Sequence, residues 1–188
     1  MFIDAVIDTE RLVIRPYCLE DLDGLYLAVS EENFYQYIPE EIPTRNDVAN
    51  IIKWSMEQNN KNTKDKIYKF NLAIFHKEDQ RIIGYCGLGP DDLQMGEIEI
   101  YYGISSLYRK QGIAFEAARA VLQYGFEVIG LPKIVALADY RNEPSLKILE
   151  KLGMNYHFRI GNLPKALQGF EGQCYYTLLA ENYFQTLH

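Results

Sequence analysis

The sequence predicts an α/β domain in which helices flank a mixed, mostly antiparallel sheet of about seven strands. Residues 97–102 alternate polar and apolar side chains, which is typical of a strand, and they lead directly into a long amphipathic helix. A short apolar stretch, residues 133–138, follows that helix, and two strands joined through a helical crossover lie parallel in one sheet. Residues 68–75 and 82–88 are predicted to form an antiparallel hairpin.

Length and composition indicate a globular protein. The chain has 188 residues, of which 48% are hydrophobic and 13% aromatic, and this excludes wholesale disorder. We expect a single domain over residues 1–188, with its core within residues 10–182. The formal net charge of −7 argues against nucleic acid as a partner and is compatible with a cationic acceptor such as an amine.

The cysteines and histidines show no spacing of the kind that holds a metal or a disulfide framework. There are three cysteines, and we interpret them as reduced thiols, packed as small hydrophobic side chains in a cytoplasmic protein. The spacing of the cysteines and histidines leads us to expect no metal. The sequence has no secretion signal and no apolar run long enough to cross a membrane, so we expect no membrane partner.

In the first half of the chain the patterns predict a strand and two helices before the hairpin. Residues 12–16 form the first strand, and residues 20–29 form a helix with one apolar face. Thr44 caps a second helix, and the polar residues 57–66 form the end of that helix and a loop.

The helix that follows residues 97–102 carries small and apolar side chains on one face, ending with Val128 and Ile129. Gly130 and Pro132 are predicted to stop it.

Beyond residues 133–138 the chain is predicted to add one more helix and two strands. Asn142 caps the helix. Residues 154–160 form a strand, residues 161–172 a mobile connection over the acceptor site, and residues 173–180 the closing strand.

The turn before the central helix has the composition of a phosphate site. Arg109 and Lys110 supply positive charge, and Gly112 has no Cβ to keep a diphosphate from the backbone. The first N–H groups of a helix have no partner inside it and carry partial positive charge, which stabilises an anion. Taken alone, the same turn is also typical of an ordinary solvated helix start.

Five segments, in order along nearly the whole chain, resemble those of the GCN5-related N-acetyltransferases. The first and last resemble the subgroup that acetylates the N-termini of ribosomal proteins. The segments are residues 9–16 with Glu20-Asp21-Leu22, residues 99–104, Arg109-x-x-Gly112-x-Ala114, Asn142-Glu143-Pro144-Ser145 with residues 149–154, and residues 174–178.

This resemblance implies that the protein binds acetyl-coenzyme A (acetyl-CoA) and transfers its acetyl group to a primary amine. The implied acceptor is a protein N-terminal α-amine, with a small amine or antibiotic as an alternative. A non-catalytic acyl-CoA binding or sensing module is a second alternative, and the subgroup often forms homodimers. The implied cofactor-binding residues are Tyr102, Gly103, Ile104, Arg109, Lys110, Gln111, Gly112, Ile113, Ala114, Asn142 and Ser145.

Glu99 is the best candidate for the general base. It shares a strand face with Glu97, and two nearby carboxylates in a partly buried site raise at least one pKa toward neutrality. Backbone amides of residues 102–104 could polarise the thioester carbonyl. The alternative is that both glutamates are solvated on an exposed strand face.

The general acid is less clearly marked. Many family members carry a tyrosine where this chain has Leu149, and this departure moves the prediction to Ser145, which matches the serine of the ribosomal-protein subgroup. Ser145 could equally be a first-turn residue of its helix, and Tyr140 and Tyr156 are weaker alternatives as acid. No activated nucleophile is apparent, so direct attack in a ternary complex fits better than a covalent enzyme intermediate.

An aromatic cluster precedes the second helix. In the family this region borders the acceptor cleft, so Tyr35 and Tyr37, together with Glu97, are the predicted substrate-binding residues. Ordinary core packing is an equally good interpretation of the two tyrosines.

Overall fold

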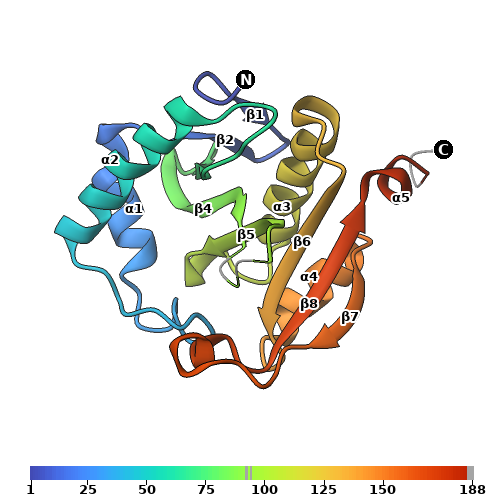
Figure 1. Cartoon of the computed structure of the whole chain (residues 1–188). Coiled ribbons are helices and arrows are strands. Elements are labelled where there is room, and N and C mark those ends of the chain that lie inside the picture. Colours follow the sequence, from blue (N-terminus) through green and yellow to red (C-terminus); the bar gives the residue numbers. More distant parts are fainter. Residues whose placement is uncertain (92, 94, 186–188) are drawn as a thin grey trace.

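The computed structural model describes residues 1–91, 93 and 95–185 and contains one mixed sheet of eight strands (Figure 1). The strand order is β1-β2-β3-β4-β5-β6-β8-β7, and every neighbouring pair is antiparallel except β5 and β6. The predicted fold class is confirmed, and the strand that was not predicted is the two-residue β1. The strands are β1 (Ile7–Asp8), β2 (Leu12–Pro16), β3 (Phe70–His76), β4 (Arg81–Pro90), β5 (Ile98–Ile104), β6 (Lys133–Asp139), β7 (Asn155–Arg159) and β8 (Gln173–Leu179).

Helices cover both faces of the sheet (Figure 1). On one side, α1 and α2 pack against each other and against β3 and β4, over a separate small core. On the other side, α3 packs on β4 and β5 and α4 on β6 and β7, over the main core. The helices are α1 (Leu22–Val29), α2 (Arg45–Lys61), α3 (Ile113–Gln123), α4 (Glu143–Lys151) and α5 (Ala180–Gln185).

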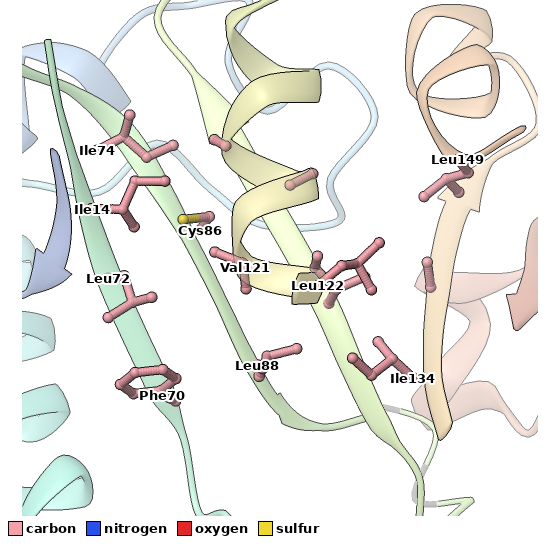
Figure 2. Close-up of a cluster of buried hydrophobic side chains, with 14 of the residues drawn as sticks. Ile14, Phe70, Leu72, Ile74, Cys86, Leu88, Val121, Leu122, Ile134 and Leu149 are labelled. Carbon is pink, nitrogen blue, oxygen red and sulfur yellow. The ribbon is translucent and has the colours of Figure 1, made fainter. Parts of the chain in front are cut away.

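The main core forms where the apolar face of α3 meets the sheet. Val121 and Leu122 lie among side chains from β4 and β6, including Leu88 and Ile134 (Figure 2). All four side chains are at most 2% exposed, and burial of each stabilises the fold by about 1.5–3 kcal/mol. This packing fixes α3 between the two strands that it connects.

The end of the central helix differs from the prediction. Residues Tyr124–Ile129 form a π-helical turn, in which the Gly130 N–H donates to the Gly125 carbonyl at 3.1 Å. Each residue of a π turn rotates less than in an α-helix, so the apolar face drifts and Val128 is 40% exposed rather than buried. Gly125 packs closely against β6 here, since a Cβ would lie 2.7 Å from Cδ1 of Ile134 and that side chain would have to shift. Gly130, at φ +84°, ends the helix as predicted.

The cap of α2 is confirmed, since the Thr44 side chain accepts from the Asp47 N–H. The closing strand is shorter than predicted. Leu179 pairs with Lys133, the first residue of β6, so Ala180 has no further strand partner and begins α5 instead. The predicted mobile connection contains a short 3₁₀ helix, Lys165–Phe170.

Among the described residues, no helix combines the length and apolar character needed to span a bilayer. In the same part of the chain, no group of three His, Cys, Asp or Glu side chains could hold a metal ion. Cys86 and Cys174 are buried, and Cys18 is half-buried.

Asp21 is a buried carboxylate that ties β2 to the start of α1. It accepts two hydrogen bonds of 2.7 Å from the Arg15 guanidinium and one of 2.8 Å from the Cys18 N–H. Burial by itself would raise the pKa of Asp21, but these hydrogen bonds outweigh burial and lower it. Because the folded pKa lies below the unfolded one, the carboxylate stabilises the fold above about pH 4, and this contribution is lost as the pH falls through the folded pKa.

We expect Asp21→Asn to lower the free energy of unfolding by about 2–3 kcal/mol at pH 7, because it leaves Arg15 without its charged partner. Denaturant unfolding at pH 7 and pH 3 measures this, and the difference from the wild type should shrink at pH 3. Asp23→Asn is the control, since the Asp23–Arg45 pair is exposed and should matter little. An equal loss at both pH values would contradict the role of the charge.

Candidate active site

The site begins where the sheet parts. β5 pairs with β4 along its whole length, but with β6 the two strands share the single described pairing Glu99↔Val135. The C-terminal parts of β5 and β6 are therefore not joined by a continuous ladder. Because both strands point the same way, these ends lie together at one edge of the gap, where α/β sheets bind ligands.

A pocket of about 610 Å³ lies at this gap. β5 contributes residues 99–102 and β6 contributes residues 136–139 to its lining. Ser145 and Leu149 line it from α4, and the segments 35–40 and 166–170 supply loop residues. A pocket bounded by both strands and by loops from both halves of the chain can hold two reactants at once.

The pocket reaches both faces of the sheet. The Tyr101 hydroxyl donates to Asn71 Oδ1 at 2.6 Å on the α1–α2 side, and Glu99, two residues earlier on the strand, shares that face. The Tyr102 hydroxyl lies 3.0 Å from Ser145 Oγ of α4, on the opposite face. All five residues line the pocket, so groups from the two faces meet through the gap.

The two predicted glutamates occupy different surroundings. Glu99 is 8% exposed and lines the pocket. Glu97 lies outside the pocket lining, where its carboxylate pairs with the Lys133 ammonium and its N–H donates to Asp91 at 2.9 Å. The expected substrate contact of Glu97 therefore has no geometric support, and Lys133 offsets the charge that was expected to act on Glu99.

Ser145 is held at the start of α4. Asn142 caps this helix as predicted, its Oδ1 accepting from the Ser145 N–H at 3.3 Å. Burial raises the pKa of Tyr102 to about 12 although the hydrogen bond to Ser145 opposes the shift, so this phenol stays protonated at neutral pH. Leu149 lines the pocket beside them and is 1% exposed. Sequence reasoning placed Tyr102 only at the cofactor and missed this pairing of hydroxyls.

The alternative acids are elsewhere. Tyr140 and Tyr156 are not among the residues that line the pocket. The Arg159 guanidinium stacks 3.5 Å from the ring centroid of Tyr140, and Tyr156 is 54% exposed on β7, the edge strand.

The predicted substrate tyrosines line the pocket. Tyr35 also packs on Phe34, with ring centroids 5.2 Å apart, and belongs to the smaller core. Tyr35 thus both packs against this core and lines the pocket, whereas Tyr37 lines the pocket without packing against this core.

The turn before α3 has a backbone suited to an anion. Gly112 is the N-cap residue of α3 with φ +79°, and Lys110 also has a positive φ, +63°. Arg109, Lys110, Gln111 and Gly112 are exposed, whereas Ile113 is buried and Ala114 half-buried, so these last two can contribute chiefly their N–H groups. Among the described residues outside the turn itself, Arg11 alone would come within 4 Å of a Cβ on Gly112, at 3.5 Å, which leaves room for a phosphate.

Arg109 links this turn to β5 and to the loop between α1 and α2. Its guanidinium donates to the Ile104 carbonyl at 3.4 Å and to the Asn33 carbonyl at 3.2 Å. Gly103 allows that loop to cross β5, since a Cβ there would lie 2.6 Å from the Phe34 ring.

A third cation beside the turn was missed by sequence reasoning. Arg11 donates to Glu116 at 2.7 Å and to the Gln111 carbonyl at 2.8 Å, and Thr9 donates to the same carboxylate at 2.6 Å. These contacts join the turn before β2 to the start of α3 and the turn that precedes it. The Thr9-Glu10-Arg11-Leu12 segment was part of the resemblance, but nothing in the sequence indicates a partner more than 100 residues away.

The sequence profile of the acetyltransferase (GNAT) domain matches residues 11–155, and the chain belongs to this family. It is therefore an N-acetyltransferase with an amine acceptor, in a family that generally uses acetyl-CoA.

Two relatives from bacilli illustrate the similarity. The chain is 31% identical over 181 residues to the uncharacterized N-acetyltransferase YnaD of Bacillus subtilis, covering 94% of this chain and 98% of the relative. It is 29% identical over 158 residues to the uncharacterized N-acetyltransferase p20 of Bacillus licheniformis, covering 84% and 86%.

Solved structures agree with the fold. A GNAT-family acetyltransferase from Bacillus anthracis superimposes with a TM-score of 0.77 at 27% identity, covering 94% of this chain and 99% of the other. A ribosomal-protein-S5-alanine acetyltransferase from Vibrio fischeri superimposes with a TM-score of 0.79, covering 96% and 99%, and at 17% identity it shows the shared fold alone.

We expect Gly112→Asp to weaken acetyl-CoA binding at least about tenfold, because the carboxylate fills the space beside the turn and repels the diphosphate. Isothermal titration calorimetry measures the affinity. The matched control is Gly153→Asp, since Gly153 has the same φ of +79° and a Cβ there would meet none of the described residues within 4 Å. Both variants should lose about 1–2 kcal/mol of stability, and equal affinities would exclude this turn as the diphosphate site.

Proposed function

We propose that the protein transfers acetyl from acetyl-CoA to a primary amine by direct attack in a ternary complex. The observation that carries the proposal is the meeting of Glu99, from one face of the sheet, with Ser145 and Tyr102, from the other, in one pocket. A base and a proton donor on opposite sides of a reacting centre suit a transfer in which one proton is removed and another returned.

The chain's residues fit the cofactor at the start of α3. The N–H groups of residues 110–114 would bind the diphosphate, with Arg109, Lys110 and Arg11 supplying positive charge beside them. Gly103, Ile104, Gln111 and Asn142 complete the proposed binding set. When bound, acetyl-CoA supplies an acetyl group activated as a thioester.

Glu99 is the proposed general base. An amine arrives mostly as ammonium at neutral pH and has no lone pair with which to attack. Glu99 is buried at the parting of β5 and β6, where it can accept that proton inside the pocket. Among the described pocket-lining residues there is no histidine to compete for this role.

Ser145 is the proposed general acid, acting on the sulfur side of the pocket. Its hydroxyl has the Tyr102 phenol 3.0 Å away, and that phenol can return a proton to Ser145 after it has donated its own. The backbone of residues 102–104 is paired to β4 but leaves the β6 ladder, so its β6-facing groups are available to a carbonyl oxygen.

Two acceptor classes follow from different observations. The opening and closing segments of the sequence support a protein N-terminal α-amine. A small amine is supported by the loops that meet over the pocket, where a Cβ on Gly169 would lie 2.9 Å from Cβ of Pro39. An extended peptide would have to pass this contact, whereas a small molecule fits beneath it.

Thiol release from acetyl-CoA across a panel of small amines and N-terminal peptides tests the proposal. Release that depends on an added amine supports transfer. Tight acetyl-CoA binding with no release for any amine would instead indicate a binding or sensing module.

We expect Glu99→Gln to cut turnover by roughly 10²–10⁴-fold at pH 7, the usual range for general acid–base catalysis, with acetyl-CoA affinity unchanged. The loss should shrink at high pH, where the amine is already neutral. Glu97→Gln is the control, since Glu97 directly precedes β5 and lies outside the pocket lining, and it should keep near-wild-type turnover. If Glu99→Gln also kept it, solvent or another residue must take the proton.

We expect Ser145→Ala to lower turnover by roughly 10–10²-fold while acetyl-CoA affinity stays nearly intact, because the thiolate would leave without its proton donor. Steady-state kinetics on protein of verified folded fraction measures this. If the only effect is a modest drop in melting temperature with unchanged turnover per folded molecule, Ser145 is a helix-start residue and no more.

A further inference from the structure

Besides Glu99, two carboxylates among the described residues line the pocket: Asp139, which pairs with Arg141, and Glu40, in the loop between α1 and α2. Glu40 lies next to Pro39, which meets Gly169 across the pocket, so it sits at the rim where the two loops close. No step of acetyl transfer uses a carboxylate at this place.

Glu40 lines the same pocket as two phenols, Tyr35 and Tyr85. Burial raises the pKa of Tyr35 to about 12, and the Glu40 carboxylate contributes to this rise. Burial likewise raises the pKa of Tyr85, with Tyr35 and Glu40 adding to the effect. The rings of Tyr35 and Tyr85 both pack on Phe34, at 5.2 and 5.8 Å between centroids, which fixes them side by side.

These tyrosines continue toward Glu99 along the α1–α2 side of the sheet. Across the β4–β5 ladder, Tyr85 is opposite Gly103 and Gly87 is opposite Tyr101, whereas Glu99 lies at the far end of the same face. A Cβ on Gly87 would lie 2.6 Å from the Tyr101 hydroxyl, so the missing side chain leaves room for that ring. At about 3.3 Å per residue, four residues along the strand separate Glu99 from the Tyr85 position by roughly 13 Å.

Charges of opposite sign lie at the two ends of this row of tyrosines, which consists of Tyr35, Tyr85 and Tyr101. Lys69 lies 4.4 Å from the Tyr101 ring centroid, and a Cβ on Gly89, opposite Glu99, would meet the Lys69 side chain at 2.6 Å. Lys69 is the one cation among the described residues that line the pocket, and it therefore disfavours a second positive charge beside Glu99. The Glu40 end presents a carboxylate and phenol rings, which attract a cation.

We propose that the acceptor is a small alkyl amine with a second positive charge, whose distal ammonium is bound by Glu40, Tyr35 and Tyr85 while its reacting amine lies at Glu99. This inference rests on the proposed function and specifies its acceptor. The distal ammonium is bound equally well in the ground state and in the transition state, so loss of the Glu40 charge should raise KM and leave kcat unchanged.

The test compares straight-chain α,ω-diamines of increasing length with monoamines of equal chain length and with N-terminal peptides, using wild type, Glu40→Gln and Glu41→Gln. Glu41→Gln is the matched control, since Glu41 is adjacent and exposed but does not line the pocket. In the wild type, kcat/KM should pass through a maximum with diamine length and exceed that of the matched monoamine by about five- to tenfold.

Glu40→Gln should remove this advantage by raising KM for diamines, with kcat and monoamine kinetics unchanged, and Glu41→Gln should behave as the wild type. Acetylation of monoamines and diamines at equal rates, or a peptide preferred over every diamine, would overturn the inference and leave the proposed transfer to amines standing. Absence of transfer to any amine or peptide by folded protein would overturn both.

Discussion

The parallel pairing of β5 and β6 is the constraint on which the rest of the molecule depends. A right-handed crossover through α3 makes the two strands parallel, and the packing of α3 on β4 and β5 fixes where that crossover starts. With the described ladder limited to Glu99↔Val135, the strands part toward their C-terminal ends and the core is open there. The pocket, the proposed base Glu99 and the Tyr102–Ser145 hydroxyl pair all lie at this parting.

The parting also explains how one pocket can serve two reactants of opposite charge. Successive side chains of a strand point to opposite faces of the sheet, so Glu99 and Tyr102 lie on opposite faces. In a continuous sheet the backbone layer would keep these two side chains apart. The basic turn before α3 lies on one side, with Arg109, Lys110 and Arg11, and suits an anionic cofactor. The pocket lining carries Glu99 and Glu40, whose carboxylates suit a cation. The basic groups of the turn lie outside that lining, so the two kinds of charge are separated in a chain whose net charge is −7.

Features set by local sequence were predictable. The caps at Thr44 and Asn142, the glycine stop at Gly130 and the parallel crossover follow from residue types and periodicity, and the structure confirms them. The π turn after Gln123 was not predicted, because the apolar periodicity of the sequence continues to Ile129 without a break.

Three side-chain contacts in and around the site were not predicted, and tertiary packing is the reason. The Arg11–Glu116 pair, the Tyr102–Ser145 hydroxyl contact and the Glu97–Lys133 pair join residues that are distant in sequence, and no local pattern records which charge meets which. The last of these changes the expected environment of Glu99, since the neighbour that was to perturb it is neutralised by Lys133. Sequence resemblance proposed the site residues, and only the tertiary contacts show which of them face one another.

A crystal structure of the protein with coenzyme A tests most directly the claim that the acetyl group passes through the gap between β5 and β6. The account predicts diphosphate oxygens within hydrogen-bond distance of the N–H groups of residues 110–114, and the sulfur in the gap, with Glu99 on one side and Ser145 on the other. A diphosphate bound away from the start of α3, or a sulfur that does not reach the gap, would contradict it.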